Sequence, residues 1–137
     1  MDVDQFQAEM KLPRSKVPTV EAIYATGFWL FERERWEDAA KVFRVMLHAA
    51  PRDERGWLAL GECHERYGQP KIALELYSAG MSVAAPPSAR CTLARARVLR
   101  ELGLDEEADA AFEQAATLAA GDEQLSALVV AEKGRVS

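Results

Sequence analysis

The sequence predicts an all-α fold built from repeated helix pairs, and two observations carry this prediction. The chain has 24 alanines among its 137 residues, and alanine is the strongest helix former. In addition, three sets of residues recur at steps of 34 and 35 positions: Gly27, Gly61 and Ala96; Ala39, Ala73 and Ala108; and Phe43, Tyr77 and Phe112. Because a repeat of this length is one helix–turn–helix unit, the chain is expected to stack such units into a superhelix.

The residue types at these positions identify the kind of repeat. A period of 34 that carries Trp, Leu-Gly, Ala and an aromatic residue is the tetratricopeptide pattern. The second unit shows it most fully, in Trp57, Leu60, Gly61, Gly68, Ala73 and Tyr77. Because Gly61 and Ala73 have little or no side chain, they are expected to let two helices cross closely. The aromatic set is expected to fill the space between one repeat and the next.

The chain is predicted to divide into five parts: an N-terminal arm at 1–17, three repeats at about 18–51, 52–86 and 87–121, and a capping helix with a tail at 122–137. In the first repeat, helices are expected at about 19–33 and 36–48, after which Pro51 breaks the chain. In the second repeat, Asp53 is expected to cap the first helix and Gly68 to end it, with Pro70 in the first turn of the next.

The last repeat and the capping helix follow the same logic. A helix is predicted from about Ser88 to a stop before Gly103, and Asp105 is expected to cap the helix that follows. Asp122 is expected to begin the last helix. One apolar stripe is predicted on that helix, made of Leu125, Leu128 and Val129. A terminal helix of this kind covers the end of a solenoid.

The N-terminal arm allows two interpretations. Phe6 and Met10 are spaced to share one helical face, but Pro13 and Pro18 restrict any helix to a length that is marginal alone in water. The segment is then either a frayed tail or an arm that packs on a partner or on a second copy of the chain.

Composition and charge exclude several classes of protein. The formal net charge is −5, which favours neither nucleic acid nor an anionic membrane as a partner. The longest uncharged run, Leu76 to Ala89, has 14 residues and includes two prolines, whereas a membrane-spanning helix needs about 20 apolar residues. The first residues are acidic, so no signal peptide is expected. Two cysteines are too few for a disulfide framework and favour a reducing compartment.

No catalytic or metal-binding pattern is present. Cys63 and His64 are adjacent and would point about 100° apart on a helix, and together with Cys91 they lack both the Cys-x-x-Cys spacing and a fourth ligand for zinc. The sequence also has no glycine-rich phosphate loop and no nucleophile elbow. We therefore expect no enzymatic activity, no cofactor and no metal site.

A binding groove is the remaining candidate site. The first helices of such repeats line the concave side of the superhelix. Residues one turn apart on those faces are Tyr24, Phe28 and Phe31; Arg55, Leu58, Glu62 and Glu65; and Arg90, Leu93, Arg97 and Arg100.

The aromatic set on the first helix is either buried core or a groove wall. Ile23, Gly27 and Leu30 already supply a core face, so the helix is apolar nearly all round, and surplus apolar surface of this kind favours a groove.

The arginine row is either a solvated face, partly neutralised by Glu62 and Glu101, or a clamp for a carboxylate. The absence of asparagine from the chain disfavours the clamp, because such sites use Lys and Asn.

The repeat residues also carry a resemblance to a family. The motifs are Ile23-Tyr24, Gly27-Phe28, Phe31, Trp36-Glu37-Asp38-Ala39 and Val42-Phe43 in the first repeat, and Asp53, Arg55, Trp57-Leu58, Leu60-Gly61, Cys63, Gly68-Gln69, Ala73, Tyr77-Ser78 and Gly80 in the second. Over about residues 20–120 the chain resembles the class II chaperones of bacterial type III secretion.

The resemblance implies a small, acidic, cytoplasmic chaperone that holds hydrophobic translocator proteins soluble before export. An extended segment of the translocator would lie in the concave groove. Tyr24, Phe28, Phe31 and Trp36 would be pocket residues, and Leu58, Leu60 and Tyr77 would be other groove or pocket-wall positions. A homodimer formed partly through the N-terminal segment is also implied. The alternatives are a general tetratricopeptide adaptor and a co-chaperone of a needle subunit of the same secretion system.

Overall fold

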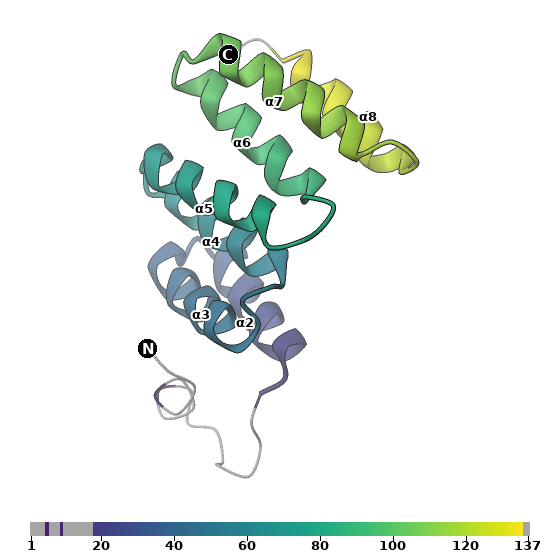
Figure 1. Cartoon of the computed structure of the whole chain (residues 1–137). Coiled ribbons are helices and arrows are strands. Elements are labelled where there is room, and N and C mark those ends of the chain that lie inside the picture. Colours follow the sequence, from purple (N-terminus) through teal and green to yellow (C-terminus); the bar gives the residue numbers. More distant parts are fainter. Residues whose placement is uncertain (1–4, 6–8, 10–17, 136–137) are drawn as a thin grey trace.

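The structure, a computed structural model, describes Gln5, Glu9 and residues 18–135. Residues 18–135 form seven helices and no strand: α2 (Val20–Glu32), α3 (Trp36–Ala49), α4 (Glu54–Arg66), α5 (Pro70–Ser82), α6 (Ala89–Glu101), α7 (Asp105–Leu118) and α8 (Glu123–Lys133). The helices stack as the pairs α2–α3, α4–α5 and α6–α7, and α8 lies against α7 and α6 (Figure 1). The predicted all-helical repeat fold is confirmed. Apart from Gln5 and Glu9, the predicted arm at 1–17 lies outside the described residues.

The turn inside each pair has one geometry, repeated three times. After α2, the Glu34 amide donates to the Phe31 carbonyl and the Arg35 amide to the Leu30 carbonyl, which is the Schellman pattern of a helix C-terminus. The same two hydrogen bonds follow α4 and α6. The residue at the centre of each turn has a positive φ: 59° at Glu34, 72° at Gly68 and 77° at Gly103. The glycines are the residues expected there, and the first repeat holds a glutamate instead.

Among the described helices, the first helix of each pair and α8 have side-chain caps, whereas the second helix of each pair has none. Capping side chains accept a backbone hydrogen bond at the starts of α2, α4, α6 and α8: Thr19, Asp53, Ser88 and Asp122. The prediction that Asp105 caps α7 is wrong, since Asp105 is the first helical residue and Leu104 occupies the cap position. The reason is the Schellman turn, which already uses the Leu104 amide in a bond to the Leu99 carbonyl and leads directly into α7.

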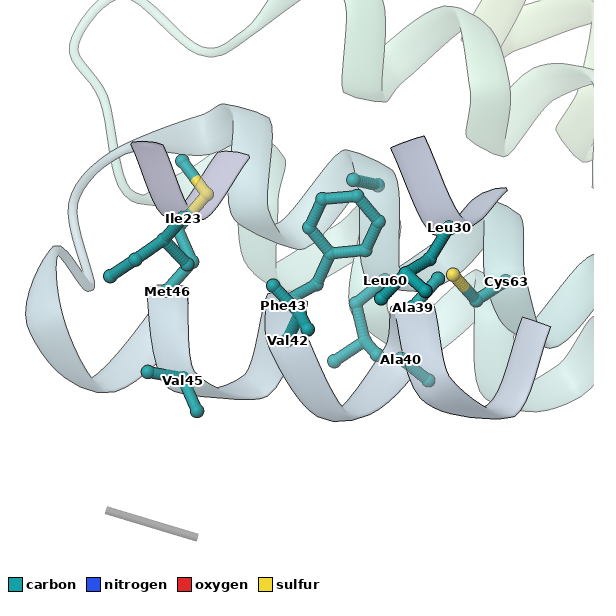
Figure 2. Packing of buried hydrophobic residues seen from close by; sticks show 11 residues of the cluster. Ile23, Leu30, Ala39, Ala40, Val42, Phe43, Val45, Met46, Leu60 and Cys63 are labelled. Atoms are coloured by element: carbon teal, nitrogen blue, oxygen red, sulfur yellow. The ribbon is translucent and has the colours of Figure 1, made fainter. Parts of the chain in front are cut away.

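In the first two pairs, the aromatic residue of the repeat lies over the small residue of its own pair. A Cβ atom placed on Gly27 would overlap the Phe43 ring, and one placed on Gly61 would overlap the Tyr77 ring. Figure 2 shows Phe43 in the middle of the first core cluster. The rings were expected to fill the space between repeats. They do reach it, because the Phe43 cluster extends to Cys63 of the next pair, but the closest packing is within the pair.

Candidate peptide-binding groove

Four aromatic side chains form a continuous cluster along α2 and the start of α3. The ring centroids of Tyr24 and Phe28 are 4.8 Å apart, those of Phe28 and Phe31 5.8 Å, and those of Phe31 and Trp36 4.8 Å. Phe28 also packs on the buried ring of Phe43 at 5.6 Å. All four are only partly buried. The sequence allowed these residues to be either buried core or a groove wall. They are both, because one side of the cluster joins the core and the other side stays accessible.

Two arginines lie over this cluster. The Arg55 guanidinium is 4.7 Å from the Tyr24 ring centroid, and the Arg66 guanidinium is 5.8 Å from that of Phe31 and 5.6 Å from that of Trp36. Such positions favour a cation–π attraction. Arg55 and Arg66 therefore border the aromatic surface at its two ends.

Two carboxylates hold Arg55 in place. Arg55 donates to Asp53 Oδ2 at 2.7 Å and to both carboxylate oxygens of Glu21, at 2.6 and 3.1 Å. The hydrogen bond from Arg55 keeps the pKa of Asp53 below its ordinary value, and the bonds to Asp53 and then Glu21 raise the pKa of Arg55. The predicted groove residue Arg55 is therefore fixed within an ion-pair network that joins α2 to α4.

Two cavities hollow the face that α2, α4, α6 and α8 share. The larger has a volume of about 430 Å³ and is lined by Phe31, Glu62, Glu65, Arg66, Arg97, Glu132 and Arg135. The smaller has a volume of about 90 Å³ and is lined by Leu58, Glu62, Arg90, Leu93, Ala94, Arg97 and Leu128. Glu62 and Arg97 line both, so the cavities are neighbours. The structure thus brings together five of the predicted site residues: Phe31, Leu58, Glu62, Leu93 and Arg97.

Arg97 belongs to a half-buried network. It donates to Glu65 Oε1 at 2.7 Å, and the Tyr77 hydroxyl donates to the same oxygen at 2.5 Å. Burial raises the pKa of Tyr77 above its ordinary value, with the Glu65 charge as the second cause. The hydrogen-bonded partner of Arg97 is therefore Glu65, which Tyr77 holds in place. Burial raises the pKa of Glu62 and the charge of Arg97 opposes that rise, so Glu62 also neutralises part of the arginine row.

Two predicted groove residues lie behind the accessible surface. Leu60 is 4% exposed and belongs to the first core cluster, and Tyr77 is fully buried. Leu60 packs against the first helix pair and Tyr77 packs against Ala94 and Val98 of α6, so both support the groove from within.

Helix α8 contributes groove residues that the sequence did not indicate. Leu128 was predicted to belong to the covering stripe with Leu125 and Val129, yet it is 39% exposed and lines the smaller cavity, while the other two are buried. Glu132 lies one turn further along and lines the larger cavity. An apolar stripe on one helix predicts that its residues are buried, but it does not indicate which other helix they contact. The position of Leu128 in the groove therefore follows only from the tertiary structure.

The end of α8 is fastened to α6 by Arg100. Its guanidinium donates to the Glu132 backbone carbonyl at 2.7 Å and lies 4.9 Å from the Phe112 ring centroid. A cation at a helix C-terminus is favourable because the last carbonyls have no partner within the helix. Arg100 thus acts as a structural tether, whereas Arg90 remains exposed at the rim of the smaller cavity.

The described residues contain no cluster of three or more His, Cys, Asp or Glu that suits a metal ion. Burial raises the pKa of the Cys63 thiol to about 12 and that of the Cys91 thiol to about 11, so neither is an activated nucleophile. Within the same residues, no helix has the length and apolar character needed to cross a membrane.

Comparisons with known proteins point to one family. No family model matches the chain. The curated "Low calcium response locus protein H" of Yersinia pestis is 36% identical over 62 residues, which are 45% of this chain and 37% of that protein's length.

Two solved structures match along nearly their whole length. PcrH of Pseudomonas aeruginosa, crystallised with the chaperone binding region of PopB, is 31% identical with a TM-score of 0.75 over 88% of this chain and 97% of that one. The type III secretion chaperone SycD of Yersinia enterocolitica, in complex with a peptide of the translocator YopD, is 28% identical with a TM-score of 0.75 over 88% of this chain and 93% of that one. With this identity over almost all of the PcrH chain, and with the fold and the hollowed face described above, the chain belongs to the class II translocator chaperones of type III secretion.

Proposed function

We propose that the chain is a bacterial cytoplasmic chaperone that binds an extended segment of a secreted translocator protein and keeps that protein soluble and competent for export. The single observation that carries the proposal is the position of Phe31. This side chain belongs both to the partly exposed aromatic cluster and to the larger cavity. Apolar surface therefore continues directly into a recess, as a groove for an extended segment requires.

The relatives support the same conclusion. SycD is seen with a peptide of the translocator YopD, and PcrH with the chaperone binding regions of PopB and PopD. A translocator has apolar segments that would associate in water, and a chaperone that covers some of them prevents this. The predicted homodimer through residues 1–17 stays a prediction, since that segment lies almost wholly outside the described residues.

The expected affinity follows from the number of anchors. Burying one large apolar side chain contributes about 1.5–3 kcal/mol, and part of this is offset by ordering the bound segment. Two or three anchors in the aromatic cluster and the smaller cavity would then give dissociation constants on the order of micromolar.

The test is co-expression with a translocator protein of the same bacterium's type III secretion system, followed by copurification. Phe28→Glu places a charge in the middle of the aromatic cluster and is expected to abolish copurification, because a carboxylate there lies between the rings of Tyr24 and Phe31. Trp29→Glu is the matched control. Trp29 is on the same helix and also aromatic, but it is 50% exposed and lies outside the cluster.

Both variants must first be shown to be folded, by circular dichroism and thermal unfolding. If Phe28→Glu is too unstable, Phe31→Gln replaces it at the edge of the same cluster. Full retention of the translocator by a folded Phe28 or Phe31 variant would contradict the proposal, as would an equal loss with Trp29→Glu.

A further inference from the structure

Helix α8 presents a buried carboxylate to the larger cavity. Glu132 is 7% exposed, and its Oε2 atom accepts no hydrogen bond within residues 18–135. Its Oε1 atom is 3.3 Å from Arg135 Nη1, but the Arg135 side chain is 69% exposed and extends into solvent. A buried carboxylate oxygen without a donor is costly unless a partner supplies one.

A second carboxylate of the cavity is also without a donor. Glu62 lines the same cavity and forms no hydrogen bond or ion pair among the described residues. It is partly buried, and this burial raises its pKa above the ordinary value. Two carboxylates from different helices, α4 and α8, therefore face one recess with acceptor positions free.

The cations of the cavity already have partners. Arg97 donates to Glu65 in the network that includes Tyr77, and Arg66 lies over the rings of Phe31 and Trp36. An anionic occupant would have to displace these contacts while facing three carboxylates. An apolar occupant would leave the partly buried Glu62 and the buried Oε2 atom of Glu132 without donors.

We propose that the larger cavity binds a lysine or arginine side chain of the bound segment, between the carboxylates of Glu62 and Glu132. This inference rests on the proposed function and states the chemistry of the partner. An ammonium or guanidinium group carries only donors, so it satisfies both carboxylates at once. Recognition of this kind selects among segments that are equally apolar, and the aromatic cluster cannot do this by itself.

The smaller cavity beside it suits a second side chain of the bound segment. Leu58, Leu93 and Leu128 give it apolar walls, and its volume of about 90 Å³ suits one small aliphatic side chain. Because the two cavities share Glu62 and Arg97, the aliphatic and the cationic side chain must be close together in the bound segment. Helix α8 contributes to both sites, through Leu128 and Glu132, which are four residues apart and so lie on one helical face.

The test is selection of a random peptide library on the whole chain. The wild-type chain is expected to enrich peptides that carry Lys or Arg within a few residues of an aliphatic side chain. Glu62→Gln and Glu132→Gln keep the shape of each side chain and remove its charge, and both are expected to lose this enrichment. Glu113→Gln, on an exposed part of α7 away from either cavity, is the matched control and should select as the wild type does.

Affinities of one selected peptide complete the test. Replacing its basic residue by Gln should weaken binding to the wild-type chain by about tenfold or more, and should have much less effect on binding to the Glu132→Gln variant. Equal losses in both proteins, enrichment without a basic residue, or no enrichment at all would overturn the inference. The proposed function fails separately, if the translocator does not copurify. A translocator that copurifies while basic residues are not selected would refute only the cation site.

Discussion

Glu34 is a non-glycine residue at the positive-φ position that glycine occupies in the turns of the other two repeats. It has φ 59°, a conformation in which a side chain is strained, while Gly68 and Gly103 occupy the same place in their turns. Glu34→Gly should therefore stabilise the fold. Its side chain is exposed and makes no hydrogen bond or ion pair among the described residues, so the substitution removes no contact.

The size of the effect follows from two opposing contributions. A left-handed backbone costs a residue with a Cβ atom about 1–2 kcal/mol, whereas glycine loses about 0.5–1 kcal/mol more conformational free energy on folding. The net gain is about 0.5–1 kcal/mol, which in a chain of this size raises the melting temperature by about 2–4 °C.

Two further variants isolate the cause. Glu34→Ala removes the carboxylate but keeps the Cβ atom, so it should leave the stability close to that of the wild type. Gly103→Ala should lower the stability by about 1 kcal/mol; a Cβ atom there would meet nothing within 4 Å, so the backbone conformation alone is responsible. The assay is urea unfolding followed by circular dichroism. Equal stability of Glu34→Gly and Glu34→Ala would refute the reasoning, and so would an unchanged Gly103→Ala.

Three further predictions concern the buried packing. Gly61→Ala should destabilise the fold by about 1–3 kcal/mol in urea unfolding, because the new methyl group overlaps the Tyr77 ring; an unchanged midpoint would contradict that contact. In the folded protein at pH 8, the buried and protonated Cys63 and Cys91 should not react with a thiol reagent until urea unfolds the chain, and rapid labelling of either would show that it is accessible. Folding raises the pKa of the Cys63 thiol to about 12 and that of the Cys91 thiol to about 11, above the ordinary 9.0, so the unfolded chain loses these protons first. The free energy of unfolding should therefore fall as pH rises from 9 towards 11. The decrease should be smaller for Cys63→Ala, measured relative to that variant's own stability at pH 8.

The fold was predictable because a few repeated positions determine how the two helices of each pair pack together. Gly27 and Gly61 lie under Phe43 and Tyr77, at an offset of 16 residues that the sequence repeats. A Cβ atom at either glycine would overlap the ring, so the small residue and the aromatic residue together mark the helix crossing. The cap at Asp105 was not predictable in this way, because an acidic residue near a helix start is favourable both at the cap and within the first turn.

The aromatic part of the groove was also predictable, but the part formed by α8 was not. Phe28 and Phe31 stand out because α2 has more apolar residues than one core face can bury. The route of α8 depends instead on Arg100, which binds the Glu132 carbonyl 32 residues further along the chain. A backbone carbonyl has no sequence signature, so its arginine partner cannot be recognised from the pattern.

The ion pairs between successive helix pairs show how much of the tertiary structure the repeat period alone can predict. Glu21 and Arg55 are 34 residues apart, and Glu65 and Arg97 are 32 apart, so each pair joins equivalent helices at about one repeat length. The period therefore restricts the partner of Arg97 to Glu62 or Glu65. The hydroxyl of Tyr77 decides between them, because it binds Glu65 and holds that carboxylate towards Arg97. Among the described residues, Glu62 is left without a hydrogen bond or ion pair at the boundary of both cavities. The packing of a buried tyrosine thus determines which of the two carboxylates keeps its acceptor positions free.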